Sequence, residues 1–454
     1  MSRIGIIGRN SASFVSALIS IWNQNDCAVI IDPEVPLSII LKNLYDSKVT
    51  KCFIDDELYQ KLEPKNENIK FEIMEKDSQQ YPIVISENVT NTFIPRYSSQ
   101  EAVILFSSGT TGEAKGIILS YRAINRNADM IIDYMRPTRE DTIYVIKKLS
   151  HSSTIIGELL VGLKSKSKIV LSDNCPLPRK ILQNIETYRI SIMVMNPTLL
   201  YMLTNEMERH RYNTFEHLTI YSCGALLDTA LLVRAKNIWK CRNIFNLYGL
   251  TEAGPRVCAQ TEENNCPGSV GKPIGDVQIK FKNMQWMNQK NVGEICIKTS
   301  TICLGTTKGP LVLEDGWYST GDLGYQNESG EIFVVGRCDE VIIQGGHNIL
   351  PSNIEQLVMQ INEVQECAVT AVKDDVYGQI VVCLYVSESV LENQIYHYLK
   401  DYLAPYEMPK RYLKVKEIPK NINGKRDRKK IKEILTGEEN EDGVTQSDYS
   451  KCNN

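Results

Sequence analysis

The chain has 454 residues, of which 43% are hydrophobic and 23% charged, and its formal net charge is -4. This length exceeds one comfortable hydrophobic core, so we expect two or more domains. The small charge offers no basic surface for nucleic acid and no reason to expect an anionic membrane as partner. No apolar run reaches the roughly 18–20 residues of a membrane-spanning helix.

Thirteen cysteines lie singly along the chain without a Cys-x-x-Cys pair, and five histidines accompany them. This spacing argues against a zinc cluster or a disulfide scaffold and favours free thiols in a reducing cytoplasm. The segment Ala12–Trp22 is fairly apolar and follows two arginines, but Ser11 precedes it and three serines interrupt it. We therefore expect mature protein there, not a signal peptide.

The first 60 residues alternate strand and helix patterns. Strand patterns lie at IGIIG, CAVIID and KCFID, and helix patterns begin at Ser11 and Leu37. This rhythm predicts parallel strands covered by helices, an α/β architecture. Further buried strands are expected at Ala102–Phe106, Ser167–Leu171, Ser191–Met195 and Leu218–Ser222.

The pattern changes after residue 268 to short strands separated by glycine turns, and a compact unit of helices and strands follows Arg337. We predict a large N-terminal α/β domain over residues 1–337, with parallel sheets and a small β subdomain. A small, mobile α+β domain is expected at 338–435. Residues 436–454 are acidic and polar and predict a disordered tail.

A turn rich in hydroxyl groups and glycine follows the strand at Ala102–Phe106. Glycines let backbone N–H groups converge on an anion, and a lysine adds a charge-assisted contact to phosphate oxygens. No Gly-Lys-Ser/Thr opens a helix after the second glycine, so this is not a Walker A loop. A simple hairpin turn is the alternative, but the run of hydroxyls with its lysine favours phosphate binding. The candidates are Ser107, Ser108, Gly109, Thr110, Thr111, Gly112 and Lys115.

This turn resembles the phosphate loop of the acyl-adenylate-forming enzymes, a superfamily of acyl- and aryl-CoA synthetases, peptide-synthetase adenylation domains and luciferases. Each further match has an ordinary alternative, such as a turn aspartate or a solvated lysine, but their common order favours the family. The further segments that resemble its signatures are Cys223-Gly224-Ala225, Tyr248-Gly249-Leu250-Thr251-Glu252, Tyr318 to Gly324, Gly336-Arg337-Cys338-Asp339 and Asn423-Gly424-Lys425.

The resemblance implies a nucleotide site for ATP and Mg²⁺. It implies that Glu252 helps to hold Mg²⁺, that Thr251 contacts the α-phosphate and that Tyr248, before Gly249, stacks on adenine. Gly224 and Ala225 would line the adenine and acyl pockets, and Asp322 and Arg337 would bind the ribose hydroxyls.

The C-terminal residues would serve the two half-reactions in turn. By the resemblance, Lys425 bridges the carboxylate and phosphate oxygens during adenylation. The small domain would then rotate about the hinge residue Asp339 and bring Gly345 and Gly346 to the site, where a pantetheine thiol enters.

The acyl pocket is implied by residues near His151 and at strand ends. Ser152 and Ser153 are uncharged, which argues against an α-amino acid and leaves an aryl or a short-to-medium acyl acid. A buried core histidine is an equal alternative for His151. The predicted pocket residues are His151, Ser152, Met195, Cys223 and Leu247, with Asn196 and Ala225 as further candidates.

The resemblance implies a cytoplasmic, AMP-forming acid–thiol ligase that activates a carboxylic acid and transfers it to CoA. The alternatives are a stand-alone adenylation protein that loads a carrier protein and a non-catalytic nucleotide-binding relative. Most members of the superfamily carry several dozen more residues before the first βαβ unit, so the chain is expected to be N-terminally abbreviated. The particular acid and the oligomeric state stay open.

Overall fold

The computed structural model describes residues 1–62, 69–75, 81–107, 115–173, 176–210, 212–287, 290–420 and 426–436. The chain divides into two compact units, which are described separately. Unit 1 takes residues 1–280, 296–319 and 326–333, and unit 2 takes 281–295, 320–325 and the chain from 334 onward. Among the described residues, every helix is too short or too polar to span a bilayer.

A seven-stranded sheet of unit 1 has the order β17-β7-β6-β2-β1-β3-β4. Strands β1, β2, β3, β4 and β6 are parallel, and β7 and β17 are antiparallel to their neighbours. The strands are β1 (Arg3–Ile7), β2 (Cys27–Ile31), β3 (Lys51–Ile54), β4 (Lys70–Ile73), β6 (Glu101–Ser107), β7 (Lys115–Ser120) and β17 (Gly305–Thr306).

A second, eight-stranded sheet of unit 1 has the order β14-β13-β12-β11-β10-β8-β9-β5. Its central strands are parallel, and their carboxyl ends therefore meet at one edge, where ligands bind in open α/β sheets. The strands are β5 (Ile83–Val84), β8 (Thr142–Val145), β9 (Lys168–Leu171), β10 (Ile192–Met195), β11 (Thr219–Ser222), β12 (Asn243–Tyr248), β13 (Cys258–Ala259) and β14 (Lys272–Pro273).

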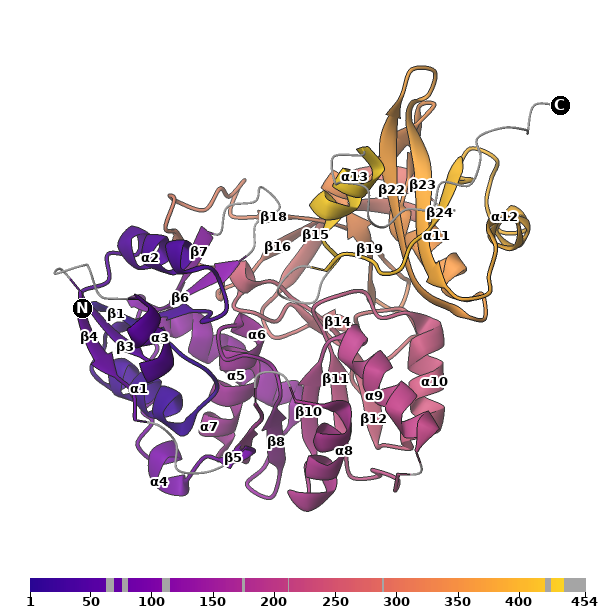
Figure 1. Cartoon of the computed structure of the whole chain (residues 1–454). Helices are drawn as coiled ribbons and strands as arrows, with labels where there is room; N and C mark the ends of the chain where they lie inside the picture. The colour runs from indigo at the N-terminus through magenta and orange to yellow at the C-terminus, as the bar shows by residue number, and fades with distance from the viewer. Residues whose placement is uncertain are drawn as a thin grey trace. The chain divides into compact units, whose positions relative to one another are not determined.

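Helices cover these sheets, with α8, α9 and α10 beside β10–β12 (Figure 1). Ser11 caps the start of α1 and Asp228 that of α10, each by accepting a backbone N–H. The helices of unit 1 are α1 (Ala12–Asn23), α2 (Leu37–Asp46), α3 (Asp56–Leu62), α4 (Glu87–Thr90), α5 (Tyr121–Met135), α6 (Ser152–Thr154), the π-helix η1 (Ile155–Leu160), α7 (Val161–Ser165), α8 (Pro178–Thr187), α9 (Pro197–Arg209), α10 (Thr229–Trp239) and the 3-10 helix η2 (Thr251–Ala253).

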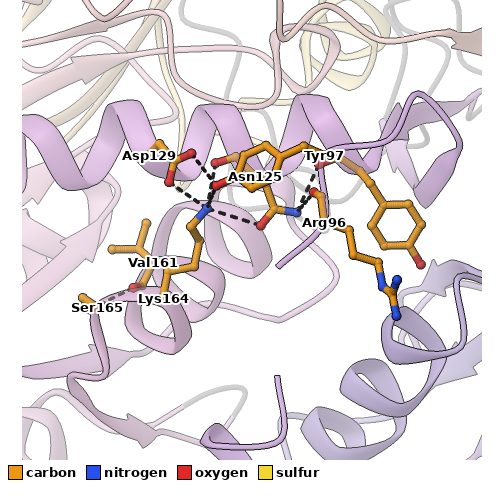
Figure 2. Close-up of polar contacts among 8 residues, drawn as sticks. Arg96, Tyr97, Asn125, Asp129, Val161, Lys164 and Ser165 are labelled. Carbon is orange, nitrogen blue, oxygen red and sulfur yellow. Dashed lines mark hydrogen bonds and ion pairs between the residues drawn. The ribbon is translucent and has the colours of Figure 1, made fainter. Parts of the chain in front are cut away.

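Polar contacts join α7 to α5 (Figure 2). Lys164 Nζ lies 2.7 Å from Asp129 Oδ1 and donates to Tyr97 Oη at 2.8 Å. Asn125 Nδ2 donates to the backbone carbonyl of Arg96 at 2.8 Å, which holds the segment before β6 against α5. The side chain of Lys164 is only 8% exposed. These contacts therefore fix the C-terminal end of the continuous helical stretch formed by α6, η1 and α7.

In the part of unit 2 that the structure describes, small sheets are accompanied by a few helices. A four-stranded sheet has the order β15-β16-β18-β19, and its residues are divided between the two units. Strand β20 pairs with β21 in a two-stranded sheet. Strands β22, β23 and β24 form a three-stranded sheet. The elements are β15 (Gln278–Met287), β16 (Lys290–Lys298), β18 (Tyr318–Gln326), β19 (Ile332–Arg337), η3 (Cys338–Glu340), β20 (Ile342–Gln344), β21 (His347–Ile349), α11 (Pro351–Val358), β22 (Val364–Asp374), β23 (Gly378–Ser387), α12 (Glu392–Lys400), β24 (Arg411–Lys414) and α13 (Arg428–Thr436).

The predicted fold class is confirmed: parallel sheets with covering helices form a large N-terminal part, and a smaller α+β part follows. The early strand and helix patterns correspond to β1, α1, β2, α2 and β3. The domain boundaries at Arg337 and residue 435 stay predictions. The predicted tail lies outside the described residues, apart from Thr436 at the end of α13.

Candidate active site

Two predicted phosphate-site residues lie together in unit 1: Lys115 at the start of β7 and Glu252 in η2. Lys115 Nζ is 3.3 Å from Glu252 Oε1, and the two side chains are 35% and 12% exposed. The backbone of η2 is held by Cys303, whose N–H donates to the carbonyl of Glu252 at 2.8 Å. A largely buried carboxylate beside an ammonium group can bind a hard cation and orient the lysine toward phosphate.

Other predicted nucleotide residues lie outside this description. The turn from Ser108 to Gly112 and the lysine at 425 are not among the described residues. Ser107 is the last residue of β6, and its backbone alone is described. The roles of these residues stay predictions.

A hydroxyl pair connects the second signature, which is the segment Tyr248-Gly249-Leu250-Thr251-Glu252, to the predicted acyl pocket. Ser152 Oγ lies 2.8 Å from Thr251 Oγ1, although the residues belong to different segments. Ser152 begins α6, and His151 precedes it as the N-cap. The fold therefore places a predicted α-phosphate contact directly beside a predicted substrate contact.

The end of β12 positions the predicted pocket residue Leu247 and the predicted adenine residue Tyr248. Leu247 and Tyr248 are buried, and both pair with β13. Gly249 follows, and a Cβ there would lie 1.9 Å from the carbonyl oxygen of Pro255. Only glycine fits this close backbone approach.

The ends of β10 and β11 position the remaining predicted pocket residues. Met195 is fully buried and packs in the large apolar core of the helices and the second sheet. The N–H of Cys223 donates to the carbonyl of Met195 at 2.9 Å. Gly224 has a φ of +93°, which favours glycine, and Gly224 and Ala225 are exposed.

A buried charge cluster, formed by Lys147, Glu158 and Arg256 around Cys223, was not identified by sequence reasoning. Lys147 Nζ lies 2.9 Å from Glu158 Oε1, 3.0 Å from Ser153 Oγ and 3.7 Å from Cys223 Sγ. Glu158 and Arg256 are 1% and 2% exposed. The signal in the sequence was a lone charge inside an apolar run, as in IIGELL, because buried charges are rare unless paired.

The cluster shifts the pKa values of its members. Burial raises the pKa of Glu158 above its ordinary value, although Lys147 and Arg256 act in the opposite direction. Burial also acts to raise the pKa of Cys223, but attraction of its thiolate by Lys147 and Arg256 outweighs burial and lowers that pKa. The potential at Cys223 is therefore positive.

The predicted ribose residues lie together in unit 2. Arg337 Nη1 donates to Asp322 Oδ1 at 2.9 Å, and Arg337 Nε donates to Asp339 Oδ1 at 3.2 Å. Burial disfavours the charged guanidinium, but the two carboxylates raise the pKa of Arg337 above its ordinary value. Gly321 has a φ of +74°, and a Cβ there would lie 3.0 Å from Arg337 Nη2. The arginine therefore connects the predicted ribose residue Asp322 to the predicted hinge residue.

Gly345 and Gly346 form the two-residue turn between β20 and β21 in unit 2. Their φ values are +59° and +85°, and Gln344 pairs with His347 across the turn. Two consecutive positive φ values are typical of a tight hairpin of this length. The N–H of Gly345 donates to the carbonyl of Tyr377 at 2.9 Å, which holds the hairpin against the next strand pair.

The comparisons with known proteins cover nearly the whole chain. Residues 1–306 match the AMP-binding enzyme family model, and residues 353–425 match the model of the AMP-binding enzyme C-terminal domain. The chain is 26% identical over 447 residues to a 2-succinylbenzoate–CoA ligase of Bacillus cytotoxicus, covering 95% of this chain and 88% of that protein. It is 26% identical over 496 residues to a malonate–CoA ligase of Arabidopsis thaliana, covering 96% of this chain and 79% of that protein.

Solved structures have the same fold. ATP-bound MatB from Rhodopseudomonas palustris superposes with a TM-score of 0.83 at 21% identity, covering 96% of this chain and 88% of that one. An o-succinylbenzoate CoA synthetase from Bacillus subtilis, in complex with its acyl-adenylate intermediate, has a TM-score of 0.79 at 20% identity and covers 98% and 89%. The chain belongs to the AMP-binding enzyme family. The predicted family is thus confirmed.

Proposed function

We propose that the chain is an acid–thiol ligase that uses ATP and Mg²⁺ to activate a carboxylic acid and transfers the acyl group to CoA. In the first step a carboxylate oxygen forms a bond to the α-phosphorus of ATP, and the bond to the leaving pyrophosphate breaks. In the second step the thiol sulfur bonds to the acyl carbon and AMP leaves. This is the activity that the sequence motifs predicted.

The proximity of Lys115 and Glu252 carries this proposal. A cationic and an anionic side chain from separate motifs lie 3.3 Å apart, and Thr251 next to Glu252 contacts the predicted pocket residue Ser152. Fixed charges beside the reacting phosphate are the main contribution that a protein makes to such a transfer. The names of the relatives support the same chemistry, since they are CoA ligases for 2-succinylbenzoate, 4-coumarate, malonate and oxalate.

Magnesium fits the carboxylate of Glu252, which is the kind of ligand this ion prefers, and a related solved structure is described with ATP and magnesium. Bound there, the ion would screen the negative charge of the phosphates. Thr251 contacts the α-phosphate in this proposal, and Tyr248 stacks on adenine. Asp322 and Arg337 hold the ribose hydroxyls, and their mutual hydrogen bond preorganises them for this.

The proposed small domain extends over residues 338–435 and carries the catalytic residue Lys425, with Asp339 as hinge and the turn at Gly345 and Gly346 beside the thiol. A pair of glycines, which lack side chains, permits close approach of the pantetheine arm. A cytoplasmic location accompanies the proposal, since the cysteines among the described residues are free thiols.

Pyrophosphate exchange with a panel of acids tests the proposal. Acid-dependent incorporation of labelled pyrophosphate into ATP is expected, and Lys425→Ala should abolish it while the protein remains folded. If the variant formed the acyl adenylate as fast as the unaltered chain, the assignment of Lys425 would fail. Absence of exchange with every acid would instead favour a non-catalytic nucleotide-binding relative.

The acceptor is tested separately by product mass. The thioester of CoA is expected when CoA is supplied with the best acid. Acylation of a phosphopantetheinylated carrier protein, without acylation of CoA, would assign the chain to the carrier-loading adenylation proteins instead.

A further inference from the structure

Apart from the thiol of Cys223, the buried charge cluster holds two cationic side chains, Lys147 and Arg256, and one carboxylate, Glu158. Lys147 pairs with Glu158 at 2.9 Å, which leaves the guanidinium of Arg256 without a second carboxylate in the cluster. Among the described residues, neither Nε nor Nη2 of Arg256 has a hydrogen-bond partner of normal geometry, although the residue is 2% exposed and the hydroxyl of Tyr134 lies beside the guanidinium. A buried cation with unpaired donors is costly, so in a native protein such a group requires a partner such as a water, an ion or a ligand.

The backbone around Arg256 is fixed, so the unpaired donors do not result from a loose segment. Asn127, itself fully buried, accepts from the N–H of Arg256 at 3.0 Å and donates to its carbonyl at 2.9 Å. A Cβ on Gly157 would lie 3.1 Å from Arg256 Nη2. The glycine therefore allows the guanidinium to lie close to η1, and π-helical turns are frequent at functional sites.

The cluster lies beside residues that the sequence assigned to the acyl pocket. Lys147 Nζ contacts Cys223 Sγ and Ser153 Oγ. Ser152, next to Ser153, contacts Thr251 of the second signature. Two hydroxyls of the same segments, Thr154 Oγ1 and Ser222 Oγ, are also buried without a hydrogen-bond partner among the described residues. The unpaired donors of Arg256, the carboxylate of Glu158 and these hydroxyls thus lie near the predicted acyl-pocket residues.

We infer that the activated acid carries a second anionic group, a carboxylate at the end distant from the reacting one, and that Lys147 and Arg256 bind it. This inference rests on the proposed function. Glu158 is a positioning residue that holds the ammonium of Lys147 in place. The hydroxyls of Thr154 and Ser222 provide further donors to carboxylate oxygens. Substrates of this class are dicarboxylic acids, aliphatic or aryl, and a second carboxylate compensates the charge that the cluster leaves open.

Matched acids test this inference. Pyrophosphate exchange is measured with dicarboxylic acids of increasing length, with the half methyl ester of each, and with the monocarboxylic acid of equal length. For the best chain length, kcat/KM for the dicarboxylic acid is expected to exceed that for its half ester by at least about tenfold, because the ester leaves the buried donors unpaired.

Variants locate the effect in the cluster. Lys147→Met should lower kcat/KM for the dicarboxylic acid by at least about tenfold, mainly through KM, and should lower the preference for the dicarboxylic over the monocarboxylic acid by the same factor. Lys147→Arg keeps the positive charge and should keep the preference for the dicarboxylic acid. This variant tests the inference if Lys147→Met fails to fold. Lys148→Met is the matched control, since the neighbouring lysine is similarly buried but pairs with Asp32 and Glu34 outside the cluster.

The outcomes separate the inference from the proposed function. Exchange with half esters or monocarboxylic acids at rates equal to those of the dicarboxylic acids would overturn the inference alone. The thiolate of Cys223 would then be the counter-charge of the cluster. Exchange with no acid at all would overturn the proposed function and the inference with it.

Discussion

Lys115 Nζ lies 3.3 Å from Glu252 Oε1, so the fold joins the lysine after the phosphate turn to the acid of the second signature. The sequence predicted both residues for the nucleotide site but not their contact. Each side chain restrains the other, which reduces the reorganisation needed when charged phosphates bind. The pair is therefore the first place to test the proposed activity.

Replacing Glu252 by Gln should lower the kcat of pyrophosphate exchange by about a hundredfold, because the amide keeps the shape but cannot balance a cation. The measurement is exchange at saturating acid and ATP over a range of Mg²⁺ concentrations. Glu262→Gln is the control, since Glu262 is 65% exposed and pairs only loosely with Arg242 at 3.6 Å. Equal exchange rates in the two variants would remove Glu252 from the proposed site.

Asp322→Asn should raise the KM for ATP by about tenfold, because a charge-assisted hydrogen bond to the ribose is lost. The unaltered chain is also expected to prefer ATP over its deoxyribose analogues, and the variant should lose most of that preference. Steady-state exchange with each nucleotide measures both effects, and Glu328→Gln, at an exposed position, is the control. If Asp322→Asn preferred ATP over its deoxyribose analogues as strongly as the unaltered chain does, the ribose-binding role of Asp322 would be disproved.

The strands and helices of the N-terminal half were predictable from local patterns. The burial of β1 and β2 follows directly from their nearly continuous apolar sequences, and Ser11 caps α1 where the polar-to-apolar change indicated a start. The motifs likewise predicted Asp322 and Arg337 as ribose-binding residues, because signature residues are recognisable without knowledge of the packing.

The buried charge cluster was not predictable in the same way. Lys147 follows a strand and resembles a solvated lysine, and Glu158 lies in a helix where an exposed acid is common. Only the packing of η1 against the segment of Arg256 places these charges together. Met195 illustrates the converse: its position at a strand end suggested a pocket, and the structure places its side chain in the apolar core, with its proposed pocket role still untested.

Lys164→Met should destabilise unit 1 by about 1 kcal/mol, since it removes the ion pair to Asp129 and the hydrogen bond to Tyr97, while these two partly exposed groups keep the hydrogen bond between them. Chemical denaturation followed by circular dichroism measures the free energy of unfolding. Lys180→Met, on the exposed face of α8, is the control and should change it by less than about 0.5 kcal/mol. A loss no larger than that of the control would show that the contacts in Figure 2 contribute little to stability.

The thiol of Cys223 should ionise at lower pH than an ordinary cysteine. Burial disfavours the thiolate, but Lys147 and Arg256 stabilise it by more, so the pKa in the folded protein is lowered. Lys147→Met removes one attraction and should raise that pKa. Because the folded pKa lies below the unfolded value, ionisation favours the folded state above the ordinary thiol pKa of about 8.5, and this contribution is lost as the pH falls through the folded pKa.

The ultraviolet absorbance of the thiolate measures this titration, as the difference between the unaltered chain and Cys223→Ser. Cys258 is the matched control, because burial raises the pKa of that thiol far above its ordinary value, and the difference between the unaltered chain and Cys258→Ser should show no thiolate near neutral pH. Ionisation of Cys223 at or above the ordinary pKa, or an unchanged titration in Lys147→Met, would contradict the positive potential on which binding of a second carboxylate depends. A titration that shifts upward in Lys147→Met but not in Lys148→Met would assign that potential to the cluster, since Lys148 pairs with acids outside it.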